Sequence, residues 1–357
     1  MIWEKSRYDN SIRFCQARRI QTGRRVKKRS KNALKLGVGL LISGFFLYLA
    51  FGRIDSTQLL NSFLRVNYWL LIPAIFVQFI SHWLRALRWR YFLKPIKRVP
   101  VGSLFSATMI GYMLNSVLPA HLGELFRAVV IGKRENIASS SVMASIVVER
   151  IIDILSLLLV MVMALLVYPF PDWVTTSGYA MFALAMGLLI FLYLLKQQHA
   201  LTTRLLDFFL GLLPQKISRK VKEMLDAFIN GISGFEKKRD ALVILVYSVL
   251  MWICYWAILH ILFYAFDLFG SYQVNTVSSV VLLVITTVSV VIPSSPGYVG
   301  TYHYLCQLAL SLFGIPRAVG LSYAFVAHAL TLIPTALVGF IFAWKEGLNR
   351  LNVENTS

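Results

Sequence analysis

The sequence predicts an all-α polytopic membrane protein with two inverted halves, about six full spans, two re-entrant broken-helix hairpins and both termini in the cytoplasm. Three observations lead to this fold class. The 357-residue chain is 57% hydrophobic and only 15% charged, whereas soluble domains contain roughly 25% charged residues. Long apolar segments alternate with short basic segments. Two apolar segments are interrupted by proline and glycine, which do not continue a helix.

The basic residues indicate how the chain is oriented. The net charge is +20, and twelve of the 36 lysines and arginines lie before Leu36. A nucleic-acid partner would explain such a charge, but the basic residues cluster in the N-terminal arm and between apolar segments, as the positive-inside rule requires. We therefore expect a basic cytoplasmic arm over 1–32, a polytopic transmembrane domain over 33–350, and no nucleic-acid partner.

The first two predicted spans cover 33–51 and 68–91 and are joined by a short loop, 52–65. A bilayer core of about 30 Å needs about 20 helical residues at about 1.5 Å each. Both segments are of this length, and basic residues follow the second span. The chain is therefore predicted to cross the membrane and return.

The next segment is predicted to be a re-entrant hairpin that turns at Pro119. Its first leg, 103–117, would reach only about 22 Å as a helix, and its return leg, 121–132, about 18 Å. Neither leg crosses a bilayer comfortably. The alternative is two short full spans joined by an outside loop. Both arrangements leave the chain on the same side of the membrane.

Four further spans are predicted over 139–168, 174–195, 242–266 and 318–344. The polar, basic segment 197–240 carries apolar residues at helical spacing, which predicts an amphipathic loop on the cytoplasmic membrane surface. A partner-binding helix is the alternative for this loop. Counting the crossings places every strongly basic loop and both termini in the cytoplasm.

A second broken hairpin is predicted around 293–300, which reads PSSPGYVG between two apolar, helix-like segments. A break at membrane depth leaves backbone amides and carbonyls unpaired, and hydrocarbon tolerates this only where protein or a water-filled cavity surrounds the break. Other parts of the chain must therefore supply hydrogen-bonding partners for the unpaired backbone amides and carbonyls at this break.

The two breaks indicate an inverted repeat of halves 33–168 and 174–350. Each half reads span, span, broken hairpin, long span, and the first half starts inside while the second starts outside. Proline followed four residues later by glycine recurs as PAHLG (119–123) and PSSPG (293–297). Transporters with inverted repeats hold their substrates where discontinuous helices meet near the midplane. A merely structural duplication is the alternative.

Five charged residues follow the first break: Glu124, Arg127, Glu149, Arg150 and Asp153. A charge at membrane depth costs at least about 2.5–3.5 kcal/mol on insertion scales, so such residues are expected to be paired or functional. Glu149 and Asp153 share a helix face at i and i+4. We expect Arg127 to pair with Glu149 or Asp153, and Arg150 with Glu124. Structural clamping without substrate contact is the alternative.

Hydrogen-bonding groups and helix N-termini also lie beside the breaks. The return legs begin near His121 and Gly300, so their free N–H groups would face the midplane, where they suit a phosphate or carboxylate. An anionic headgroup would fit this cradle, with its acyl or prenyl tail left in the bilayer. The side chains next to the breaks are Asn115, Ser116, Ser294 and Ser295.

Two histidines, His303 and His328, lie in apolar helices of the second half. Such residues are more often buried structural histidines than ligands. As a pair they would make transport pH-dependent, because histidine titrates near physiological pH. The candidate substrate-binding residues are therefore Asn115, Pro119, His121, Gly123, Glu124, Arg127, Glu149, Arg150, Asp153, Ser294, Ser295, Pro296, Gly297, Gly300, His303 and His328.

Three segments together resemble the lysylphosphatidylglycerol synthase transmembrane region, a flippase-like domain that also occurs as stand-alone proteins. They are LPAHLGELFRA (118–128), SSSVMASIVVERIIDIL (139–155) and PSSPGYVGTYHYL (293–305). The resemblance covers about 33–347 and leaves out the basic arm. The matching positions are Pro119, Gly123, Glu124, Arg127, Glu149, Arg150, Asp153, Pro296, Gly297 and Gly300.

The chain departs from the family pattern at four positions. The family often has arginine at His121, a second glycine at Tyr298, an acid at His303 and arginine at His328. In fused family members a soluble acyltransferase-like domain transfers an amino acid from tRNA, and the residues after the last span are too few to form it. The resemblance therefore implies lipid translocation and no enzyme activity.

Taken together, these features predict a flippase-like protein of the cytoplasmic membrane that moves an anionic phospholipid or polyprenyl-linked lipid between leaflets. The alternative is a non-transporting scaffold or accessory subunit of an envelope-lipid or glycan-assembly enzyme. Membrane lipids are the expected partners, and a second copy or an envelope-biogenesis protein is left open. No cofactor, metal or disulfide is expected, because the three cysteines are scattered.

Overall fold

The structure is a computed structural model that describes residues 41–52, 54–118, 122–167, 238–291 and 296–354, together with Gly37 and a few single positions between 179 and 218. Several predictions fall outside these residues. They concern the basic arm, the span over 174–195, most of the loop over 197–240, and Pro119, His121, Ser294 and Ser295.

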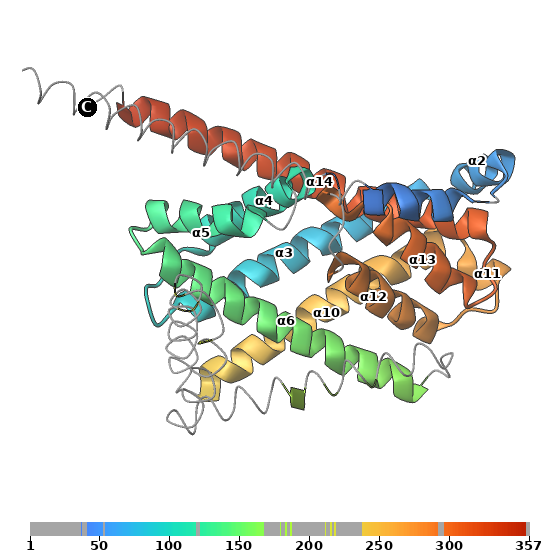
Figure 1. The fold of residues 1–357 in the computed structure, drawn as a ribbon, viewed down its shortest axis with the longest axis horizontal. Helices are drawn as coiled ribbons and strands as arrows, with labels where there is room; N and C mark the ends of the chain where they lie inside the picture. The colour runs from blue at the N-terminus through green and yellow to red at the C-terminus, as the bar shows by residue number, and fades with distance from the viewer. Residues whose placement is uncertain are drawn as a thin grey trace, which may run out of the picture.

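Every element in the described part of the chain is a helix (Figure 1). After a helix over Leu41–Phe51, the elements are α2 (Ser56–Leu64), η1 (Tyr68–Leu70), α3 (Leu71–Leu93), α4 (Val101–Val117), α5 (Leu122–Arg134), α6 (Ser139–Val167), α10 (Lys238–Ala265), α11 (Leu268–Ser271), α12 (Thr276–Val291), η2 (Pro296–Tyr298), α13 (Thr301–Ser311) and α14 (Arg317–Glu354).

Four helices are long and apolar enough to cross a membrane: Tyr68–Leu93, Ser139–Val167, Arg239–Ala265 and Arg317–Gly347. They coincide with four of the predicted spans, so the chain is a multi-pass membrane protein. Large apolar side chains remain exposed on these helices, such as Trp69, Leu166 and Trp344, as expected for surfaces that face lipid. The number of spans and the side of each terminus stay predictions.

The predicted loop over 52–65 is wrong in one respect, because most of it is helix α2. Asp55 caps this helix by accepting a hydrogen bond from the Thr57 amide at 2.8 Å, which satisfies one of the free N–H groups of the first turn. Phe63 packs near Phe325 of α14, with ring centroids 6.4 Å apart. Tertiary packing therefore helps to hold a helix that is too short to be stable alone.

Both predicted helix breaks are present. Helix α4 ends at Val117 and α5 begins at Leu122, so the legs have 17 and 13 residues. Helices α12 and α13 have 16 and 11 residues. All four are shorter than the roughly 20 residues that a full span needs. Short legs are what re-entrant hairpins require, and their depth in a membrane stays a prediction.

The helices of the two predicted halves interlock. Helix α3 packs along α10, and these two helices are the second spans of the two predicted halves. The long helix α6 packs against α12, while the long helix α14 packs against α4. In Figure 1, α4 and α5 lie on one side of the molecule and α12 and α13 on the other, with α3, α6 and α10 running between them. This reciprocal exchange is what two related halves would produce.

Candidate functional site

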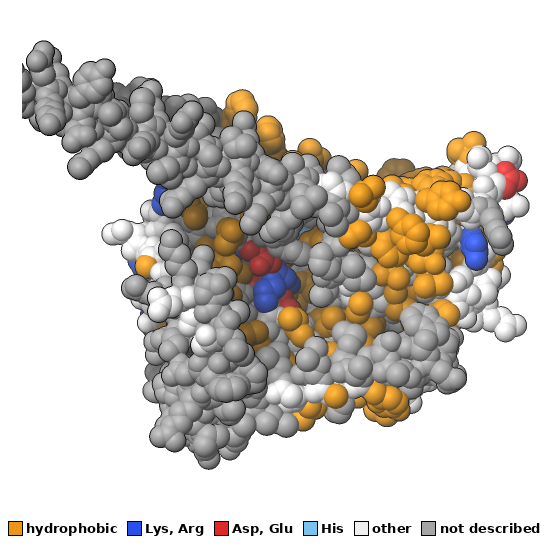
Figure 2. All heavy atoms as spheres, viewed as in Figure 1, with side chains coloured by type: hydrophobic (Ala, Val, Ile, Leu, Met, Phe, Trp, Pro, Cys, Tyr) orange, Lys and Arg blue, Asp and Glu red, His pale blue; other side chains and the backbone are white. Residues whose placement is uncertain are grey.

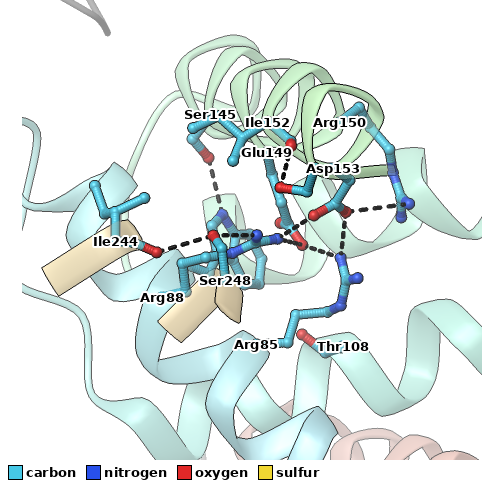
Figure 3. Close-up of polar contacts among 12 residues, drawn as sticks. Arg85, Arg88, Thr108, Ser145, Glu149, Arg150, Ile152, Asp153, Ile244 and Ser248 are labelled. Carbon is cyan, nitrogen blue, oxygen red and sulfur yellow. Dashed lines mark hydrogen bonds and ion pairs between the residues drawn. The ribbon is translucent and has the colours of Figure 1, made fainter. Parts of the chain in front are cut away.

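Seven charged side chains meet between α3, α5 and α6, and we call them the charge network. Figure 3 labels Arg85, Arg88, Glu149, Arg150 and Asp153 among them. Helix α3 contributes two arginines, α5 an acid and an arginine, and α6 two acids and an arginine. Its members are Arg85, Arg88, Glu124, Arg127, Glu149, Arg150 and Asp153.

Glu149 is the centre of the network and its side chain is fully buried. One carboxylate oxygen accepts a hydrogen bond from Arg127 Nη2 at 2.9 Å. The other oxygen accepts from Arg85 Nη1 and lies 3.7 Å from Arg88 Nη2. A single buried carboxylate therefore faces three guanidinium groups, and the predicted pairing of Arg127 with Glu149 is confirmed.

Asp153 lies one turn further along the same face of α6, as its spacing predicts. Its Oδ1 accepts from Arg88 Nη2 at 2.6 Å, and its Oδ2 accepts from Arg85 Nη1 at 3.0 Å. Two arginines of α3 thus bridge both acids of α6. Such charge-assisted bonds are roughly twice as strong as neutral ones, so they hold α3 and α6 in register.

Arg127 is held from its other side by an aromatic ring. Its guanidinium carbon lies 3.6 Å from the centroid of Trp89, within the range of a cation–π interaction. Trp89 is itself fixed, because its Nε1 donates to Ser145 Oγ at 2.9 Å. The charge of Arg127 is therefore enclosed by protein on both sides.

The outer edge of the network is open to the surface. Arg150 Nε lies 2.7 Å from Glu124 Oε1, which confirms this predicted pair, and the two side chains are 37% and 16% exposed. Figure 2 shows acidic and basic side chains together near the centre of one face, with hydrophobic side chains next to them. Polar groups are thus presented to the surface within an otherwise apolar region.

The network also reaches the second predicted half. Arg88 Nη1 donates to Ser248 Oγ at 3.0 Å, and Arg85 Nη2 donates to the Tyr255 hydroxyl at 3.0 Å, both on α10. Sequence reasoning missed these two arginines, which lie inside the second predicted span. The signal was available, because Gln78, His82, Arg85 and Arg88 lie on one side of α3 at helical spacing.

The first break is fastened by two of the predicted site residues. Asn115 Oδ1 accepts a hydrogen bond from the Gly123 amide at 2.8 Å. A Cβ atom at Gly123 would overlap the carbonyl oxygen of Gly111, so only glycine lets α4 and α5 approach this closely. Asn115 and Gly123 therefore hold the hairpin together, and the Asn115 amide oxygen is already engaged.

The second break turns through two glycines with positive φ, +69° at Gly297 and +94° at Gly300, where residues with a side chain are strained. A Cβ at Gly297 would lie 3.4 Å from the carbonyl oxygen of Ser116. Ser116 stands at the end of α4, so the two breaks meet, as the inverted arrangement predicts. The Ser43 hydroxyl donates to the carbonyl of Val299 and satisfies part of the broken backbone.

The two histidines form a buried pair between α13 and α14. His303 Nε2 lies 3.4 Å from His328 Nδ1. The Gly300 amide donates to His303 Nδ1 at 3.2 Å, so this ring caps the first turn of α13. The pair joins the second break to the last span at the two positions where the resembling family often has an acid and an arginine. Within the described residues, no cluster of three or more potential metal ligands occurs.

Comparison with known proteins gives one family and two relatives. The family model described as "Lysylphosphatidylglycerol synthase TM region" matches residues 36–339. The UPF0104 membrane protein MJ1595 of Methanocaldococcus jannaschii is 22% identical over 316 residues, which cover 85% of this chain and 92% of that protein. The Glycosyltransferase AglD of Haloferax volcanii is 31% identical over 133 residues, which cover 37% of this chain and 21% of that protein.

Proposed function

We propose that this chain, which belongs to the lysylphosphatidylglycerol synthase TM region family, translocates an anionic phospholipid or polyprenyl-linked lipid between the leaflets of the cell membrane. One observation carries the proposal. The charge network reaches the surface at Arg150, whose side chain is 37% exposed, and Figure 2 shows charged side chains next to hydrophobic ones on one face. A lipid headgroup would find polar partners there while its tail remained in hydrocarbon.

The location of this opening also supports a translocation path. Helix η2 of the second break packs against α4, and α4 packs against α5, which carries Glu124. The second break in turn contacts the end of α4 through Gly297 and Ser116. Discontinuous helices that meet at a polar site are the arrangement in which transporters rock two halves around a substrate.

Transport can be tested with the purified protein in vesicles that contain labelled anionic phospholipids or polyprenyl-phosphate lipids. We expect faster movement between leaflets for at least one class. The Arg150→Gln variant should lose this activity while its thermal stability stays close to that of the parent, because its side chain lies at the open edge. Arg90→Gln is the matched control, since Arg90 is exposed and lies outside the network. Unaccelerated movement of every lipid class would refute the proposal.

A scaffold is the second candidate, and the completeness of the ion pairs favours it. Five of the seven network side chains are mostly buried and bonded to one another, as they would be in a clamp that only joins α3, α5 and α6. A scaffold would keep its cellular function in Arg150→Gln cells, and it would copurify with a stable protein partner.

A further inference from the structure

We propose that the site selects lipids whose headgroup carries one negative charge, as in a phosphodiester, over lipids with two. This inference rests on the proposed function and names its substrate class. It follows from the charges of the charge network. The network contains four arginines and three carboxylates, so its net charge is +1.

The network can be reached from the surface at one place, the side chain of Arg150, which is 37% exposed. The side chains of Arg85, Arg88 and Arg127 are at most 6% exposed, and each bonds to Glu149 or Asp153. Arg150 differs, because its Nε faces Glu124 while its Nη1 lies 3.8 Å from the nearest oxygen of Asp153. That distance is too long for a hydrogen bond. The outer nitrogens of Arg150 are therefore the donors that an incoming headgroup would meet.

A phosphodiester fits these donors in both geometry and charge. It has two non-bridging oxygens, and a guanidinium binds such a pair through two parallel N–H···O bonds. One added negative charge brings the network to neutrality. A headgroup with two negative charges would leave the site at −1 inside an apolar face, where a charge without a partner is strongly disfavoured.

Two lipid sources share this chemistry, and the experiment separates them. Phosphatidylglycerol and a polyprenyl-phosphate-linked sugar are both monoanionic phosphodiesters, whereas a polyprenyl-diphosphate-linked sugar carries two charges. In vesicles, we expect at least one phosphodiester lipid to move on the order of 50-fold faster than the diphosphate lipid, as one unpaired charge at membrane depth implies. Movement of either phosphodiester lipid with this preference supports the inference and identifies the tail that the protein accepts.

A variant that changes the net charge of the charge network tests the inference more directly. Glu124→Gln raises the net charge to +2 while the glutamine oxygen can still accept from Arg150, so the preference for the phosphodiester should fall at least tenfold. Arg90→Gln leaves the count unchanged and should keep the preference. Equal rates for both charge classes in the parent, or the same preference in Glu124→Gln, would overturn the inference.

The failure of transport and the failure of this inference can be told apart. When no lipid moves, the proposed function is wrong, and binding of the same lipids measured by native mass spectrometry still tests the charge preference. Phosphodiester lipids that bind more tightly than diphosphate lipids, with the difference reduced in Glu124→Gln, support the inference. Equal binding refutes it.

Discussion

Removing the carboxylate of Glu149 should leave one arginine stranded. Arg85 and Arg88 each keep Asp153 as a partner, at 3.0 and 2.6 Å. Arg127 has Glu149 as its only carboxylate partner among the described residues. The Glu149→Leu variant therefore leaves the buried guanidinium of Arg127 without a carboxylate contact.

The expected loss of stability can be estimated from the contacts that Arg127 keeps. Breaking a buried ion pair by removing one partner costs about 3–5 kcal/mol. Arg127 would still lie over the ring of Trp89, and a desolvated cation–π contact contributes about 2 kcal/mol. We therefore expect Glu149→Leu to lower the free energy of unfolding by about 3 kcal/mol, near the lower end of that range.

A double variant separates a stranded charge from a packing defect. Replacing a buried ion pair by apolar residues is often close to neutral, so Glu149→Leu with Arg127→Leu should recover about 2 kcal/mol of the loss. The measurement is unfolding in mixed micelles with increasing SDS, followed by circular dichroism. Glu135→Leu is a control, because Glu135 lies 3.7 Å from the half-exposed Lys97, and such a pair contributes about 0–1 kcal/mol. A double variant as unstable as the single variant would refute the reasoning.

Two further substitutions test the breaks. Gly123→Ala should lower the free energy of unfolding by about 1–3 kcal/mol, because its Cβ would overlap the Gly111 carbonyl. Gly102→Ala should have little effect in the same SDS unfolding assay, because a Cβ at Gly102 would have no atom within 4 Å. Equal effects would contradict the proposed close approach. His303→Leu should lower the free energy of unfolding by about 1–3 kcal/mol, because it leaves the buried Gly300 amide without a hydrogen bond. His303→Gln keeps an acceptor and should retain most of the stability. Identical losses in both variants would show that this cap does not contribute to stability.

Much of the fold could be predicted because a membrane imposes simple rules on sequence. Four predicted spans match helices of the structure, since crossing hydrocarbon requires about 20 apolar helical residues. The breaks are where proline and glycine place them. The pairs Arg127–Glu149 and Arg150–Glu124 are present, because charges in an apolar region must find one another.

Other features of the structure could not be predicted from the sequence. Arg85 and Arg88 lie inside a segment whose overall composition is that of a span, and their partners are 61 or more residues away in the chain. The sequence predicts a loop where helix α2 lies, because the stability of α2 comes from a cap and from packing against α14. Local composition does not reveal such distant contacts.

The sequence by itself determined that this protein lies in the membrane, that two of its helices are broken, and that buried charges follow the first break. Each of these depends on residues near one another in the chain, because hydropathy and backbone geometry act locally. Only the tertiary structure decided that Gly297 meets Ser116, that two arginines of α3 join both acids of α6, and that Arg150 is the exposed arginine of the charge network. Those facts depend on how helices far apart in sequence pack together, because packing fixes which charges are enclosed and which one remains exposed.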